Sequence, residues 1–241
     1  ISSIYSDLQQ HKLCIAYCDS VIKIDSTHIF ATILKGEALV KNGQTQAALD
    51  QYYTLYLRDS SNINFMKRIG SLYTKMDSLN NAIDWYSRAL DTDTTDIPSY
   101  THLGNLFVLT KQYELGLPVL DKAILLDSIN SLLYRFRGSL NIMGANFSAA
   151  ESDFSKAILF GDSTAFTFRH LGLSLYHQSK YDEAFPVYKT TVKLDPEDSQ
   201  AWYYLAFCNK WKGDIEEAIS CMEKSLELSV TPGISDIYDG L

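Results

Sequence analysis

The stretch LGLSLYHQSKYDEA, from Leu171 to Ala184, carries the pattern that decides the fold. Gly172 stands inside an apolar, helix-like run, where a glycine costs about 1 kcal/mol relative to alanine. A step of 34 residues from Gly172 reaches further glycines in both halves of the chain. The residues on this grid are Gly36, Gly70, Gly104, Gly138, Gly172 and Ala206. A regular period without insertions indicates an array of stacked structural repeats.

A second marker on the same grid is the small residue at Ala184. Its counterparts are Cys14, Ala48, Ala82, Gly116, Ala150 and Ala218. Large residues follow four positions later and apolar residues eight positions later, and these spacings lie on one face of a helix. Each repeat is therefore predicted to hold two helices, at about 165–179 and 181–194 in the repeat that contains the opening stretch. The grid glycines and alanines are predicted to be packing residues where helices meet.

Helix start signals recur on the same grid. The residue before each first helix is His28, Asn62, Asp96, Asn130, Thr164 or Asp198. Five of these six are residue types that favour the N-cap position, because a short polar side chain accepts a hydrogen bond from a free backbone N–H. Helix starts are therefore predicted at regular intervals along the chain.

These residues together resemble the tetratricopeptide repeat, whose 34-residue unit has small, aromatic and proline residues at fixed offsets. Two repeats carry the resemblance, through Phe168, Leu171, Gly172, Tyr181, Ala184, Tyr188, Pro196, Trp202, Leu205, Gly213 and Ala218. Lys35 and Arg137 depart from the family by replacing the leucine before the glycine, and Gly116 replaces the alanine. The resemblance implies an all-α, right-handed α-α superhelical solenoid of antiparallel helix pairs.

The grid predicts that residues 1–241 form a single solenoid. Its repeats are expected at 1–28 (partial), 29–62, 63–96, 97–130, 131–164, 165–198, 199–232 and 233–241, the last being a truncated first helix. The incomplete ends lead us to expect a fragment of a longer protein, with self-association possible where terminal repeats lack caps.

Composition narrows the class of protein. The chain is 46% hydrophobic and 21% charged, which is typical of a packed, ordered domain. Its net charge of −8 argues against nucleic acid as a partner. No apolar run approaches the roughly 18 residues of a membrane span, so we expect a soluble chain. The chain begins with Ile1, and because this end looks truncated or processed, no compartment is assigned.

Motifs for catalysis, phosphate loops and metal binding are missing from the sequence. Cys14 and Cys18 lie four residues apart, which is too few ligands for a metal, and buried thiols are the simpler interpretation. His170 and His177 are interpreted as surface or groove histidines. We therefore expect a non-enzymatic protein with no cofactor and no metal site.

Charge is unevenly distributed between the predicted helices. The first helices of the six full repeats hold one acid, Glu37, and ten bases, giving a net charge of +9. The bases are Lys35, Lys41, Lys67, Arg68, Lys75, Arg135, Arg137, Arg169, Lys210 and Lys212. In the family these helices line the concave face, so the count indicates a basic groove in an acidic body. The alternative is that acids simply favour helix starts and turns.

The family resemblance also indicates which positions of a first helix face a ligand. Mapped onto this chain, the candidate groove residues are Lys67, Arg135, Arg169, Tyr176, His177, Tyr203, Lys210 and Trp211. Arg135, Arg169, His177, Lys210 and Trp211 are expected to be exposed. The two-carboxylate clamp of co-chaperone repeats finds no full match, since Ser71 stands where that pattern needs an asparagine after Lys67.

The sequence thus predicts a scaffold that binds a peptide or protein segment, acidic or extended, in a basic and aromatic concave groove. Two alternatives stay open. One alternative to the scaffold is the sensory or regulatory repeat region of a larger signalling protein, and the other is an accessory segment of an enzyme whose catalytic domain lies outside these residues.

Overall fold

A computed structural model describes residues 2–229, and in this part of the chain all regular structure is α-helical. The contacts divide the chain into two compact units, residues 1–106 and 107–241. Within each unit the helices follow one another as packed neighbours, as in an array of helix pairs. That all the repeats form one continuous solenoid stays a prediction.

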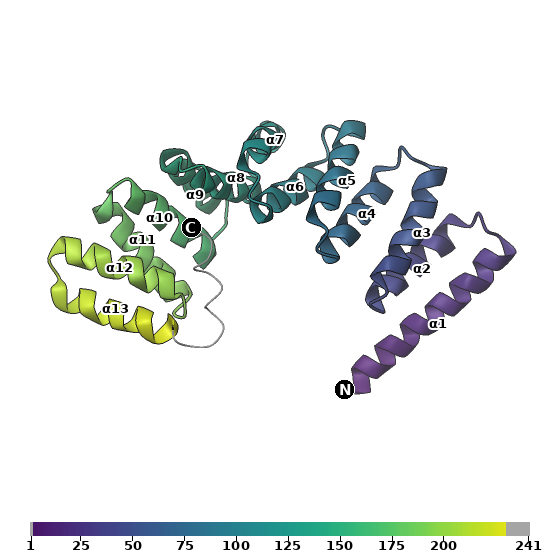
Figure 1. Cartoon of the computed structure of the whole chain (residues 1–241), viewed down its shortest axis with the longest axis horizontal. Helices are drawn as coiled ribbons and strands as arrows, with labels where there is room; N and C mark the ends of the chain where they lie inside the picture. The colour runs from purple at the N-terminus through teal and green to yellow at the C-terminus, as the bar shows by residue number, and fades with distance from the viewer. Residues whose placement is uncertain (1, 230–241) are drawn as a thin grey trace. The chain divides into compact units, whose positions relative to one another are not determined.

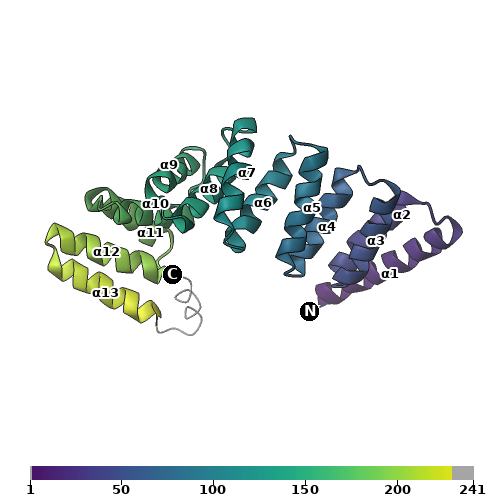
Figure 2. The same ribbon diagram turned by 45° about the horizontal axis from the view of Figure 1, so that its top comes forward.

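The first compact unit holds the early helices, and from α1 to α5 each helix packs against its neighbour in chain order (Figures 1 and 2). The sixth helix begins in this unit and ends in the second. The bounds are α1 Ser2–Ile24, α2 Ile29–Lys41, α3 Thr45–Arg58, α4 Ile63–Lys75, α5 Leu79–Thr92 and α6 Ile97–Leu109.

The second compact unit continues the same pattern of consecutive packing, from α7 to α13 (Figure 1). Its helices are α7 Tyr113–Leu126, α8 Ser131–Met143, α9 Phe147–Leu159, α10 Ala165–His177, α11 Tyr181–Leu194, α12 Ser199–Lys212 and α13 Ile215–Ser229. The predicted helices at 165–179 and 181–194 correspond to α10 and α11. None of the helices within residues 2–229 has the length and apolar character needed to cross a bilayer.

Side chains at several helix starts accept hydrogen bonds from backbone N–H groups, as predicted, with one unexpected cap at His28 and one predicted cap missing at Asn130. Asn62, Thr164 and Asp198 accept hydrogen bonds from the first turns of α4, α10 and α12. His28, the residue type least expected at this position, also caps its helix through Nδ1, at 3.1 Å from the Ala31 nitrogen. Asn130 makes no such bond and instead donates to Asp127.

Four of the grid glycines, Gly36, Gly70, Gly138 and Gly172, face a ring on the second helix of their own repeat, sixteen residues later. A Cβ built on Gly36 or Gly70 would lie 2.8 or 2.9 Å from the ring of Tyr52 or Tyr86, respectively. The corresponding distances are 3.0 Å for Gly138 against Phe154 and 2.8 Å for Gly172 against Tyr188. These glycines therefore make room for a ring, rather than for a second backbone.

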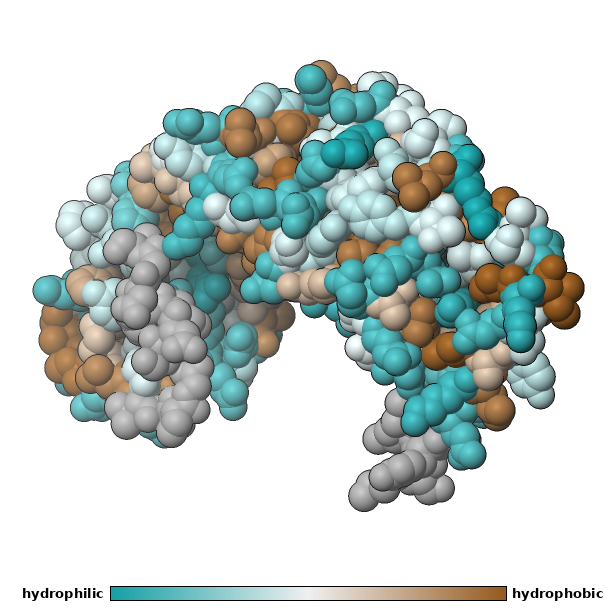
Figure 3. Space-filling model, turned by 45° about the vertical axis from the view of Figure 1, so that its right-hand side comes forward, coloured by the Kyte–Doolittle hydropathy of each residue, from teal (hydrophilic) through white to brown (hydrophobic). Residues whose placement is uncertain are grey.

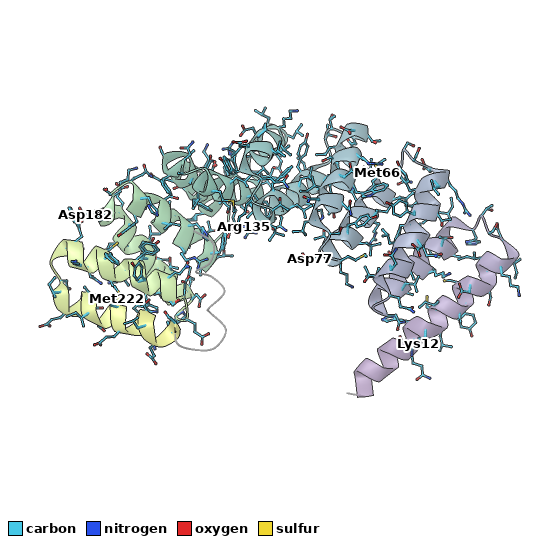
Figure 4. All side chains as sticks on the ribbon, in the orientation of Figure 1. Lys12, Met66, Asp77, Arg135, Asp182 and Met222 are labelled. Atoms are coloured by element: carbon cyan, nitrogen blue, oxygen red, sulfur yellow. The ribbon has the colours of Figure 1, made fainter. Side chains whose placement is uncertain are left out.

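Two other grid positions, Ala206 and Gly116, differ from this arrangement. Ala206 takes the glycine position in its repeat, and the residue sixteen positions later is the flexible Met222 on α13 (labelled in Figure 4). Gly116 replaces an alanine, and a Cβ there would lie 2.5 Å from Leu140 and 2.8 Å from Phe107. A larger residue at position 116 would therefore require its neighbours to move.

Apolar side chains form a core in each compact unit. One cluster runs from Leu39 to Ala89 across α2–α5, and another runs from Ala150 to Cys221 across α9–α13. The small grid residues Ala48, Ala82, Ala150, Ala184 and Ala218 are all buried. All four cysteines are free thiols, as expected for small buried or half-buried side chains.

Charged residues replace the family leucine at two positions, and both are compensated by acids. Arg137 binds Asp153 on α9, with Nη2 to Oδ1 at 2.6 Å, and Asp121 on α7 at 2.7 Å. Asn141 completes the cluster by donating to Asp153, which is 2% exposed. Lys35 likewise pairs with Asp19 on the preceding helix at 2.7 Å.

Candidate binding surface

An aromatic pocket of ≈ 270 Å³ lies in the second compact unit, among α10, α11 and α12. It is lined by Tyr176, Tyr181, Phe207, Lys210 and Trp211. Tyr176 comes from the last turn of α10, Tyr181 opens α11, and the other three lie on the second half of α12. Because three helices contribute, the pocket depends on how neighbouring repeats stack.

Ring-to-ring contacts hold these side chains in place. The centroids of Tyr181 and Trp211 lie 4.9 Å apart, and those of Tyr176 and Tyr181 lie 5.3 Å apart. Tyr203, another candidate, contacts Phe207 with centroids 4.9 Å apart, so it stands beside the pocket. Trp211 remains 65% exposed in spite of its contact, which leaves most of its surface for a ligand.

The two histidines differ in their surroundings. His177 is exposed and stacks on Phe147 at 4.3 Å, and partial burial lowers its pKa. His170 is half-buried against Phe166, with ring centroids 3.9 Å apart. Burial, with the nearby Arg169 charge, lowers the pKa of His170 to about 4. At neutral pH His170 is therefore an uncharged packing residue.

The candidate cations Lys67, Arg135 and Arg169 are not free, which corrects the expectation drawn from the charge count. Each occupies the fifth position of its repeat and pairs with an aspartate at the end of that repeat. Lys67 Nζ lies 2.7 Å from Asp96, Arg135 Nη1 lies 3.1 Å from Asp162, and Arg169 Nη1 lies 3.5 Å from Asp198.

These three cations are also mostly covered. Their side chains are only 21–24% exposed, so Arg135 and Arg169 lack the exposure that was expected of them. Arg169 also donates to Gln200 at 3.2 Å. A role in ligand binding for these residues stays a prediction, and it would require a ligand to compete with existing ion pairs.

The aspartates have a second task, because each also orders the turn before the next helix. Asp96 accepts from the Ser99 nitrogen and Asp198 from the Ala201 nitrogen. Burial raises the pKa of Asp96, but hydrogen bonds from Lys67 and Ser99 outweigh this and leave it below its ordinary value. For Asp162 the penalty of burial is likewise outweighed, mainly by hydrogen bonds from Thr164 and Thr167, so its pKa is lowered too.

A signal for these pairs was present in the sequence and was missed. Repeats with a cation at the fifth position carry Asp96, Asp162 or Asp198 near their ends. The two repeats with Ile33 or Thr101 at that position end in neutral residues, Asn62 and Asn130. Asp96 and Asp198 thus stand at the last position of repeats with a cation at the fifth position, whereas the repeat of Arg135 ends in Thr164 and its paired acid is Asp162, two residues earlier.

Ion pairing removes most of the excess positive charge from the first helices. At least six of the ten bases form ion pairs, including Arg68 with Glu37 at 3.0 Å. Lys210, which is exposed, has no ion pair within residues 2–229. In the same part of the chain, no group of three metal-ligating side chains is placed to hold an ion.

Comparison with known proteins settles the family. Sequence profiles described as tetratricopeptide repeat match residues 175–228, and also residues 1–28 and 68–96. The chain is a tetratricopeptide repeat protein. Proteins with these repeats are generally non-catalytic scaffolds that bind protein or peptide partners. No curated protein sequence matches the chain.

Solved structures share the tetratricopeptide fold with this chain. A repeat protein from Parabacteroides merdae has a TM-score of 0.66 at 14% identity, covering 98% of this chain and 94% of its own. PilF of Pseudomonas aeruginosa has a TM-score of 0.68 at 18% identity, covering 88% and 93%. YrrB, described as having an unusual peptide-binding site, has a TM-score of 0.65 at 17% identity, covering 79% and 98%. At these identities the similarity establishes the fold alone.

Proposed function

We propose that this protein is an interaction scaffold that holds an extended, acidic segment of a protein partner at the aromatic pocket. The observation that carries the proposal is the pocket itself, where four aromatic side chains lie beside Lys210, which has no ion-pair partner among residues 2–229. Aromatic residues in such pockets provide most of the binding energy of many interfaces.

The neighbouring surface favours an extended ligand. A second pocket of ≈ 280 Å³ shares Phe207 and Lys210 with the aromatic pocket and is otherwise lined by apolar residues. Its other lining residues are Ala206, Ile215, Ala218, Ile219 and Met222. A segment with two apolar side chains a few residues apart would fill both pockets, with Lys210 available for an acidic residue between them. YrrB, with its described peptide-binding site, is a structural precedent for such a role.

The expected preference for acidic segments depends on one side chain. It does not depend on a groove lined by free cations, since Lys67, Arg135 and Arg169 form ion pairs. It depends on Lys210, whose ammonium group can form a charge-assisted hydrogen bond with a carboxylate. The expected salt dependence is therefore that of one or two charges, rather than that of a wide basic surface.

A peptide array tests the proposal. Immobilised 12-residue peptides would carry two aromatic or leucine residues, flanked by Asp and Glu in one set and by Lys in a matched set. We expect the chain to bind the acidic set, and Trp211→Ala to weaken binding by about tenfold or more. Lys210→Glu is expected to abolish or invert the charge preference. Intrinsic tryptophan fluorescence, compared between the parent and Trp211→Ala, gives a second readout in solution.

Two exposed positions supply matched controls. Lys193→Glu reverses a charge on α11 and Leu159→Ala removes an exposed apolar side chain on α9, and neither residue lines the pocket. Both variants should bind as the parent chain does. Tight binding of the lysine set, without salt dependence, would contradict the proposal.

A further inference from the structure

A second, chemically different pocket lies in the first compact unit, lined by residues of α2, α3 and α4. It measures ≈ 330 Å³ and is formed by Glu37, Val40, Lys41, Tyr52, Arg68, Ser71, Leu72 and Lys75. Three of these side chains are cationic and one is acidic. The lining thus carries a local excess of two positive charges in a chain whose net charge is −8.

The three cations differ in what holds them. Lys41 is exposed and has no ion pair within residues 2–229. Lys75 reaches from the end of α4 to the Val40 carbonyl of α2, at 3.3 Å. Arg68 donates to Glu37 at 3.0 Å, and both side chains of this pair remain well exposed, at 58% and 40%. An exposed pair of this kind contributes little to stability, so Arg68 can exchange partners at small cost.

The pocket lies at the C-terminal ends of two helices, so an anion can bind there only if cationic side chains offset the partial negative charge of these ends. Lys41 and Lys75 are the last residues of α2 and α4, where free carbonyl groups carry partial negative charge. An anion would be repelled there without the lysines. Loss of one lysine should therefore have a larger effect than loss of an ordinary surface charge.

We infer that this pocket binds a phosphorylated serine or threonine side chain of a partner. A phosphoryl group carries −1.5 to −2 charges at neutral pH and three strong acceptor oxygens. The charge matches the excess of two, and the donors are Lys41, Lys75 and Arg68. A carboxylate would neutralise only half of the excess. Val40 and Leu72 provide apolar walls for the carbon atoms next to the phosphate.

Glu37 gives the inference its sharpest consequence. In the free protein its carboxylate forms an ion pair with Arg68, so an incoming phosphate has to displace the carboxylate. Glu37→Gln removes this competing charge and keeps the shape of the side chain. The variant should therefore bind a phosphorylated ligand more tightly, by about threefold to tenfold, which is the opposite of what a loss of fold would produce.

The experiment uses the whole chain and three degenerate 13-residue peptide libraries, with phosphoserine, serine or glutamate at the central position. Binding is measured by fluorescence anisotropy. We expect the phosphoserine library to bind at least tenfold more tightly than the other two. Lys41→Gln and Lys75→Gln should each reduce this affinity by about tenfold, and Glu37→Gln should raise it. Lys23→Gln, at an exposed lysine of α1, is the matched control and should change nothing.

Several outcomes would overturn the inference. Equal binding of the serine library would show that the phosphate is not recognised, and equal binding of the glutamate library would replace phosphate by a general negative charge. Weaker binding by Glu37→Gln, with an unchanged circular dichroism spectrum, would remove the role assigned to Arg68. The pocket shares no residue with the aromatic pocket, so Trp211→Ala leaves this assay unchanged and the two proposals fail separately.

Discussion

The repeats at 131–164 and 165–198 occupy the same grid and bury opposite chemistry at equivalent positions. In the first, the buried Asn141 and Asp153 form a polar network with the half-buried Arg137. In the second, Leu171, Leu175 and Val187 stand at the corresponding places within an apolar cluster. The same helix pair thus accommodates either a polar network or an apolar cluster, provided that all three residues change together.

The difference shows what a repeat scaffold tolerates. Asp153 is 2% exposed, and it accepts bonds from both Arg137 and Asn141. Burial lowers the pKa of Arg137, but its bonds with Asp153 and Asp121 outweigh this and raise the pKa above its ordinary value. A fully paired network of this kind is tolerated in a core, whereas a partly paired one is strongly destabilising.

The largest expected effect comes from breaking the network at one member. Asp153→Ala leaves the half-buried Arg137 with only the exposed Asp121 as a partner, and leaves the Asn141 amide without its acceptor. We expect the free energy of unfolding to fall by about 3–5 kcal/mol. Urea denaturation followed by circular dichroism measures the change. Val187→Ala, at the equivalent position of the apolar repeat, should cost clearly less.

Replacing the whole network shows whether the loss in Asp153→Ala comes from unpaired polar groups or from the loss of the network itself. Arg137→Leu, Asn141→Leu and Asp153→Val together copy the apolar solution of the next repeat. This triple variant should be as stable as the parent or more stable, since replacing buried ion pairs by packed apolar groups is often neutral or stabilising. A triple variant as unstable as Asp153→Ala would show that the network is required by its position.

The second effect concerns pH and appears in the apolar repeat. His170 has a pKa of about 4 in the folded chain, against about 6.5 when unfolded, because burial disfavours its charged form. Its contribution to stability is present above pH 6.5 and is lost as the pH falls towards 4, by about 2 kcal/mol. Phe136 stands at the equivalent position of the neighbouring repeat.

His170→Phe copies that neighbour and removes the titrating group. As the pH is lowered from 6.5 to 4, the parent should lose the His170 contribution and the variant should not, so the free energy of unfolding of the variant minus that of the parent should increase. Chemical denaturation at several pH values tests this. A difference that does not change with pH would mean that His170 titrates normally in the folded state.

The smallest effect concerns the glycine of the opening stretch. Gly172→Ala places a Cβ 2.8 Å from the ring of Tyr188, which is fully buried. We expect a loss of about 1–2 kcal/mol, because the strain exceeds the gain in helix propensity. Gly138→Ala, against Phe154 at 3.0 Å, should cost somewhat less in the network repeat.

A rescue identifies the cause of that loss. Gly172→Ala combined with Tyr188→Met copies the natural pair of Ala206 and Met222. The double variant should recover at least half of the stability lost by the single one, measured by thermal unfolding. Tyr188 Oη has no hydrogen-bond partner within residues 2–229, so its removal leaves no new unpaired group. Without recovery, the ring contact would not be the source of the loss.

The 34-residue grid was sufficient to predict the helix pairs, because periodicity depends only on positions along the chain. It did not reveal that Gly172 faces a ring sixteen residues away, since that contact depends on how two helices cross. The charge count failed at Arg135 and Arg169 for a similar reason: it added charges within helices and ignored the acids in the turns. Of the pocket residues, Tyr176, Lys210 and Trp211 were predicted, whereas Tyr181 was missed because it lies on a second helix.

The ion pairs of Lys67, Arg135 and Arg169 have a consequence for how such an array can grow. Cation and aspartate lie in the same 34-residue segment, although the aspartate orders the helix that follows. A tandem duplication or deletion of one whole segment therefore carries both partners along and strands neither charge. In these segments the means of joining one repeat to the next is inherited with the repeat itself, so the length of the array is free to change by recombination.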